Sequence, residues 1–104
     1  MKRIHAAHML IPHDIETQLI RLGVPSDKKW TLVDMRTYSP DPILTEVRIY
    51  IDAQLRHALA SYPMNNRFVY NEEIPGGTEI VIMGITQASQ GDWIKMTLVI
   101  DEHD

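Results

Sequence analysis

Hydrophobic and polar residues alternate along residues 30–38 and 44–51. Such alternation is typical of strands that bury one face and expose the other. If the two segments fold back on each other, opposite charges face one another and stabilise the pairing by roughly 0.2–1 kcal/mol per pair. The pattern therefore predicts an antiparallel hairpin with one apolar and one mixed face. The mixed face pairs Arg36 with Glu46, Asp34 with Arg48 and Leu32 with Tyr50, and the apolar face pairs Met35 with Val47 and Val33 with Ile49.

Residues 78–86 and 92–101 alternate in the same way and predict a second hairpin. Apolar side chains occupy both of its faces, a pattern typical of strands that are covered on both sides. Two further segments of the chain predict single strands. They are residues 2–11, in which Ile4, Ala6 and Leu10 share a face, and residues 68–74.

The spacing of apolar residues changes to that of a helix after residue 13. Ile15, Leu19 and Leu22 lie at positions i, i+4 and i+7, which places them on one face of a helix. Asp14 is a suitable N-cap residue, and Gly23 supplies the stop. The sequence therefore predicts a short amphipathic helix between Asp14 and Gly23.

Residues 43–62 fit two interpretations. β-Branched residues alternate with polar ones up to Ile51, which favours a strand. Asp52 would then cap a helix over residues 53–62. The alternative is one helix of about five turns, because apolar residues across the whole segment also fit a single helical stripe. We favour the strand followed by the helix.

The predicted order is strand, helix, strand, strand, helix and three strands, within one domain of 104 residues. This order predicts an α+β fold, in which a mostly antiparallel sheet of five or six strands carries two short helices on one face. The order is similar to that of ferredoxin-like proteins that dimerise sheet to sheet. Since this similarity lies in element order alone, it implies a fold and no function.

Two short helices can cover only one face of such a sheet. The other face would then expose a large apolar patch, which is uncommon on a monomer. We expect a second copy of the chain to cover it, because closed two-fold dimers are the commonest oligomers. The residues expected on this face are Leu32, Tyr50, Val81, Met83, Ile85, Trp93 and Val99, with Trp30 and Tyr38 beside them.

Composition excludes several classes of function. The chain has no cysteine, so it has no disulfide framework, thiolate nucleophile or cysteine-based metal site. Its formal charge is +2 over residues 1–70 and −6 over residues 71–104, with the cations scattered. Nucleic-acid binding through phosphates needs clustered cations, so no nucleic-acid partner is expected. The sequence contains no apolar segment long enough to predict a membrane span or a secretory signal, so we expect a cytoplasmic protein without a membrane partner.

The five histidines do not predict a metal site. Catalytic zinc needs three converging protein ligands, and none of the histidines has the tight spacing that forces such convergence. No glycine-rich phosphate loop opens a helix either, because Pro75-Gly76-Gly77 precedes a predicted strand. We therefore expect neither a metal nor a cofactor.

The mixed face of the first hairpin is the strongest candidate for a ligand site. Four charged residues lie there beside aromatic rings, and an arginine can hold a carboxylate or a phosphate in a two-pronged contact. The simplest alternative is a ladder of ion pairs that stabilises the strands. The expected ligand-binding residues are Trp30, Asp34, Arg36, Glu46, Arg48, Tyr50 and Trp93.

Two hypotheses for the function follow. The first is a non-catalytic association protein, a homodimer that binds a protein partner or a small ligand through its sheet face or an intersubunit cavity. The second is a small cavity enzyme of the isomerase, lyase or monooxygenase type, in which polar residues of the mixed face orient the substrate. Catalytic residues are not assigned by any motif.

Overall fold

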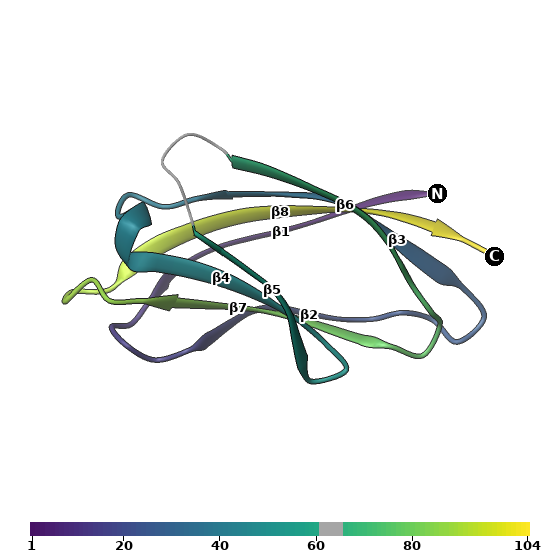
Figure 1. Cartoon of the computed structure of the whole chain (residues 1–104), viewed down its shortest axis with the longest axis horizontal. Helices are drawn as coiled ribbons and strands as arrows, with labels where there is room; N and C mark the ends of the chain where they lie inside the picture. Colours follow the sequence, from purple (N-terminus) through teal and green to yellow (C-terminus); the bar gives the residue numbers. More distant parts are fainter. Residues whose placement is uncertain (61–65) are drawn as a thin grey trace.

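The computed structural model of the chain is a sandwich of two four-stranded antiparallel sheets (Figure 1). It describes residues 1–60 and 66–104, and the side chains of residues 1–59 and 69–104. A single 3₁₀ turn, η1 (Pro42–Leu44), interrupts the succession of strands in these ranges. The strands are β1 (Lys2–Ile11), β2 (Thr17–Gly23), β3 (Lys29–Tyr38), β4 (Thr45–Ile51), β5 (Gln54–Ala60), β6 (Asn66–Ile74), β7 (Glu79–Thr86) and β8 (Asp92–His103).

The strand order defines a jelly roll. The first sheet has the order β1-β8-β3-β6 and the second the order β2-β7-β4-β5. Successive strands therefore alternate between the two sheets, except for β4 and β5, which form a hairpin. Eight strands in two sheets with these connections are the jelly-roll arrangement, which occurs in proteins as different as capsid proteins, lectins and cupins. Function has to be sought in the surface rather than in the fold.

The predicted α+β class is wrong, because the described residues form strands and no α-helix. The segment expected as the first helix contains β2, and its apolar spacing has a local cause. A register shift between Gln18 and Ile20 marks a bulge in β2, and a bulge places consecutive residues on the same side of a strand. Leu19 and Ile20 both pack against the core as a result, and the stretched spacing resembles a helical period.

The second predicted helix and its single-helix alternative are also wrong over the described residues. Residues 54–60 form β5, which pairs with β4 through a two-residue turn at Asp52 and Ala53. The strand expected to end at Ile51 is present as β4. Ser61 and Tyr62, the last residues of the expected helix, lie outside the described residues.

Both predicted hairpins are wrong in their pairing. β3 pairs with β6 and β8, whereas β4 pairs with β5 and β7. β7 and β8 likewise lie in different sheets. Alternation shows which side chains point to a core, but it does not show whether two apolar faces lie side by side in one sheet or stack in a sandwich. The predicted partners Arg36 and Glu46 therefore lie on different sheets.

The hydrophobic core fills the space between the two sheets. Its side chains come from alternate positions of the strands of both sheets, as expected for stacked sheets. Leu32, which was expected on an exposed face, is fully buried here. The completely buried core side chains are Ile11, Leu32, Met35, Val47, Ile49, Ile74, Ile80, Ile82, Ile94, Met96, Leu98 and Ile100.

Candidate association surface

The outer face of the first sheet carries a row of apolar side chains across its strands. The register places Ile4 opposite Val99, Val99 opposite Asp34, and Asp34 opposite Val69. Ile4 is 62% exposed and Val69 is 58% exposed, whereas the Asp34 side chain is buried. We call Ile4, Val99 and Val69 the apolar row. Exposed apolar side chains that lie together on one face are typical of interaction sites.

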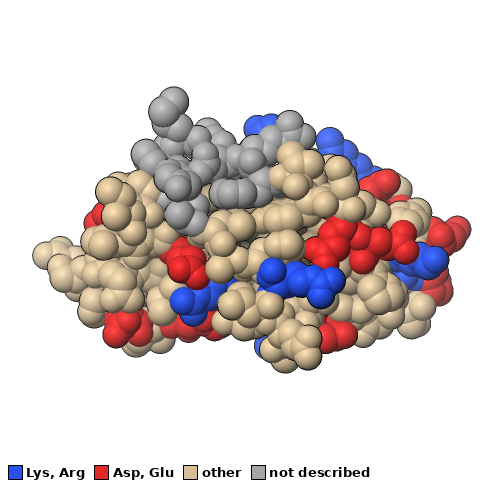
Figure 2. Space-filling view, in the orientation of Figure 1, with Lys and Arg blue, Asp and Glu red and all other residues tan. Residues whose placement is uncertain are grey.

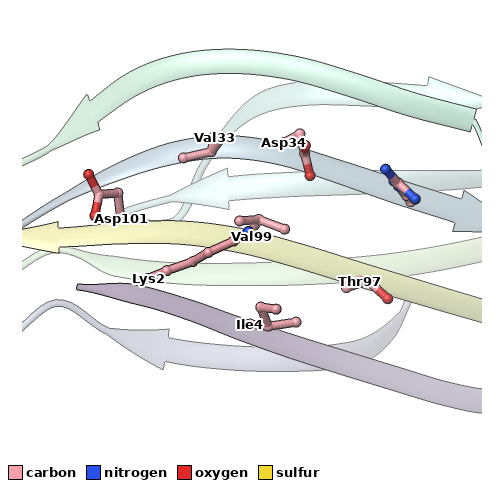
Figure 3. Close-up of a pocket in the computed structure, with 8 residues that line it drawn as sticks. Lys2, Ile4, Val33, Asp34, Thr97, Val99 and Asp101 are labelled. Atoms are coloured by element: carbon pink, nitrogen blue, oxygen red, sulfur yellow. The ribbon is translucent and has the colours of Figure 1, made fainter.

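A hollow of about 560 Å³ lies over Ile4 and Val99 of this row. Figure 3 shows that its walls come from β1, β3 and β8. Its lining combines aliphatic side chains with side chains of both charges, and Figure 3 shows the Lys2 side chain extending across it towards Val99. A hollow of this composition suits an amphipathic partner surface or a small ligand with an apolar body. The lining residues are Lys2, Ile4, Val33, Asp34, Arg36, Thr97, Val99 and Asp101.

Charged side chains lie on both sides of the apolar row. Along β8, the outward positions run from Lys95 through Thr97 and Val99 to Asp101. The two charged residues of this run are exposed, so both are accessible to a partner. Arg36 is also exposed and lies opposite Thr97. Lys95 and Arg36 therefore lie towards one end of the apolar row, and Asp101 lies towards the other, where the exposed Lys2 is its neighbour in the register.

Trp93 and Leu10 add a second apolar group at the end of this face. They are opposite each other in the register, and each is about half exposed. The rings of Trp93 and His8 lie 5.1 Å apart between centroids, at 54°. The buried Asp92 fixes the start of β8, because its carboxylate accepts the Trp93 backbone N–H at 3.0 Å.

The seven residues expected to bind a ligand do not form one site. Asp34, Arg36 and Trp93 lie on the outer face of the first sheet. Trp30 is buried, and its indole N–H donates to the Glu102 carboxylate at 2.8 Å. The remaining three residues lie on β4 and face outward from the second sheet. They are Glu46, Arg48 and Tyr50.

On the second sheet, Arg48 is held by two carboxylates of its own chain. Its Nε donates to Glu46 at 2.8 Å, and a terminal nitrogen donates to Glu16 at 2.6 Å. Tyr50 donates its hydroxyl to the same Glu16 oxygen at 2.9 Å. These hydrogen bonds raise the pKa of Arg48, and the bond to Glu16 raises the pKa of Tyr50. Sequence reasoning missed Glu16, because the wrongly predicted helix did not bring it beside Arg48 and Tyr50.

A third polar cluster joins the edges of the two sheets, between β5 and β6. His57 Nε2 lies 2.9 Å from a Glu72 carboxylate oxygen, and Arg56 donates to the other oxygen at 2.6 Å. The Tyr70 ring packs 4.3 Å from the His57 ring, and burial raises the pKa of Tyr70 to about 12. Figure 2 shows that side chains of opposite charge lie next to one another along this side of the molecule. This interspersion suits a surface of local ion pairs rather than one that attracts a strongly charged partner.

The described part of the chain has no group of three or more metal-ligating side chains. It also has no helix long and apolar enough to cross a membrane. The class that the fold defines is thus an eight-stranded jelly roll with an apolar row on the outer face of its first sheet. Neither the known protein-family models nor the curated protein sequences gave a match to the chain.

Proposed function

We propose that the protein is a non-catalytic association protein, a homodimer that works through the outer face of its first sheet. The observation that carries this proposal is the exposed apolar row beside the hollow. Two copies packed face to face would remove both rows from water, and a two-fold dimer is the simplest closed assembly. The hollow, enclosed between the subunits, would then be the place for a small ligand, and the rest of the surface would serve a protein partner.

The free energy gained by burying the apolar row is too small to drive dimerisation alone, so the interface also needs polar contacts. Fully burying an aliphatic side chain contributes about 1.5–3 kcal/mol. Ile4 and Val69 are each about 60% exposed, so their two copies in a dimer contribute about 4–7 kcal/mol together. The loss of translational and rotational freedom on association costs about 4–15 kcal/mol. The charged side chains beside the row must therefore complement the partner.

The alternative, a small cavity enzyme, has less support. The polar residues expected to orient its substrate lie on the outer faces of two different sheets. Arg48 is already bonded to two carboxylates, which leaves it poorly placed to hold a substrate in a two-pronged contact. No observation on the described residues favours a reaction over binding.

Analytical ultracentrifugation over a dilution series tests the proposal. We expect a dimer, and we expect Ile4→Asp to dissociate it, because the change places a charge in the apolar row. Leu55→Asp is the matched control, because Leu55 has a similar exposed fraction, 54%, but lies on β5 of the second sheet. A wild-type protein that stays monomeric at every concentration would overturn the proposal. So would a dimer that Leu55→Asp dissociates and Ile4→Asp does not.

A further inference from the structure

The inference here rests on the proposed function and concerns how a second copy sits on the apolar row. We infer that the two-fold axis crosses the strands midway between Thr97 and Val99. In this register Lys95 of each subunit faces Asp101 of the partner subunit. The interface would then contain two equivalent ion pairs, one on each side of Thr97 and Val99, in the manner of a self-complementary two-fold contact.

The register follows from the order of the outward side chains on β8. A two-fold axis that lies in the interface, perpendicular to the strands, reverses this order in the second copy while keeping each strand over its own equivalent. With the axis midway between Thr97 and Val99, Thr97 of each subunit faces Val99 of the partner subunit. Lys95 and Asp101 are both three residues from this axis, so they face each other in the same way.

Other positions of the axis bring like charges together or lose the ion pairs. An axis through Thr97 places Arg36 over Arg36 of the partner subunit, because Arg36 is opposite Thr97 in the register. An axis through Val99 places Asp101 over Thr97 of the partner subunit, so the ion pairs with Lys95 are lost. Opposed like charges destabilise an interface. The intermediate position instead keeps the two Arg36 side chains apart and retains both Lys95–Asp101 pairs.

An axis parallel to the strands is the remaining choice. Placed between β8 and β3, it would put Lys95 over Tyr38 of the partner subunit and Arg36 over Thr97 of the partner subunit. Neither pair has opposite charges, and Asp101 would face Thr31 of the partner subunit.

Placed between β1 and β8, an axis parallel to the strands would put Lys2 over Asp101 of the partner subunit and Ile4 over Val99 of the partner subunit. β3 and β6 would then lie beyond the edge strand β1 of the second copy, and Val69 would stay exposed. The axis perpendicular to the strands both covers the whole apolar row and pairs opposite charges.

The distances and exposures are compatible with the proposed pairs. Three residues of a strand span about 10 Å, and stacked sheets cross at about 30°, so facing residues at this distance from the axis stay within reach of a lysine side chain. Lys95 is exposed, and the Asp101 side chain is 56% exposed. Within its own chain Asp101 contacts the terminal ammonium of Met1 at 3.3 Å, an exposed ion pair of little energetic weight.

Charge reversal with mixing tests the register. Lys95→Asp alone and Asp101→Lys alone each place like charges across both equivalent pairs, so we expect the dissociation constant of each homodimer to rise about tenfold or more. A mixture of the two variants restores opposite charges in both pairs. We therefore expect heterodimers to form preferentially, which native mass spectrometry can count because the two variants differ in mass. The double variant in one chain should also dimerise like the wild type.

The matched controls are Arg21→Asp and Glu79→Lys, which reverse an exposed ion pair on the second sheet. We expect them to leave dimerisation unchanged and to show no preference for heterodimers. Circular dichroism of each variant checks that it folds. If Ile4→Asp dissociates the dimer but the two β8 variants show no mutual rescue, the register is overturned and the proposed function stands. If the wild-type protein is monomeric throughout, the proposed function fails, and the register fails with it.

Discussion

At the scale of single residues, the turn between β4 and β5 holds an alanine in an unfavourable conformation. Asp52 and Ala53 have φ angles of 49° and 65°, the left-handed region that two-residue hairpin turns need at both central positions. An L-residue there costs roughly 1–2 kcal/mol. Asp52 is compensated, because its carboxylate accepts the Glu79 backbone N–H at 2.9 Å. Ala53 has only a methyl group and gains no such bond.

We therefore expect Ala53→Gly to raise the free energy of unfolding by about 0.5–1 kcal/mol. Glycine removes the steric cost, and its greater freedom in the unfolded chain offsets only part of this gain. Urea denaturation measures the change. The control is Ala58→Gly, an exposed position within β5, which should lower the free energy of unfolding by about 0.5–1 kcal/mol. If both variants lose stability equally, the turn is not strained.

At the scale of elements, one buried carboxylate holds the connection between β3 and β4 against the start of β8. Asp92 accepts a hydrogen bond from the Thr45 hydroxyl at 2.7 Å and another from the Asp41 backbone N–H at 3.3 Å. The Thr45 hydroxyl also lies 2.9 Å from that of Thr86 on β7. The Asp92 side chain thus holds together the 3₁₀ turn η1 and the ends of β4, β7 and β8. It also positions Trp93, the first residue of β8 on the outer face, by accepting its backbone N–H.

Asp92→Asn should lower the free energy of unfolding by about 1–3 kcal/mol. The asparagine amide group has one acceptor oxygen fewer, so a buried donor loses its partner. Thermal and urea denaturation measure the loss. Asp27→Asn, at an exposed loop position, is the control and should change stability by less than about 0.5 kcal/mol. Equal effects in the two variants would mean that the Asp92 cluster does not hold this end of the sandwich.

At the scale of the whole molecule, the sequence predicted which side chains face the core better than it predicted which strands are neighbours. Met35, Val47 and Ile49 were expected on an apolar face, and all three are fully buried. The faces predicted for Leu32 and Val33 were exchanged. The reason is a bulge in β3 between Leu32 and Asp34, which shifts the alternation by one residue. Strand neighbours depend on contacts far apart in the chain, on which local alternation carries no information.

The candidate surface was predictable only in part, for the same reason. Asp34, Arg36 and Trp93 were expected on a functional face, and they do lie on the outer face of the first sheet. Ile4 was expected to share a strand face with Ala6, as it does, but this face is turned outward rather than into the core. A strand at the edge of a sheet shows similar alternation whichever face is buried. Only the position of β1 beside β8 decides the question.

The cluster between β5 and β6 links the two sheets along one side of the sandwich, since His57 belongs to the second sheet and Glu72 to the first. Burial alone would raise the pKa of Glu72, but the hydrogen bonds from His57 and Arg56 outweigh it and lower the pKa below its usual value of 4.5. The folded protein therefore binds a proton at Glu72 less readily than the unfolded chain does. Its contribution to stability is present above about pH 4.5 and is lost as the pH falls through the folded pKa.

We expect Glu72→Gln to weaken the fall of the unfolding free energy between pH 6 and pH 3, because the variant lacks the carboxylate whose protonation opposes folding. Chemical denaturation at a series of pH values measures this slope. Glu73→Gln is the matched control, since Glu73 is the exposed neighbour on the same strand, and it should keep the wild-type slope. If both variants follow the wild-type curve, the link between the two sheets does not depend on the charge of Glu72. The acid sensitivity must then arise elsewhere. The next candidate is the Glu102 carboxylate, which accepts a hydrogen bond from Trp30 and has a lowered pKa.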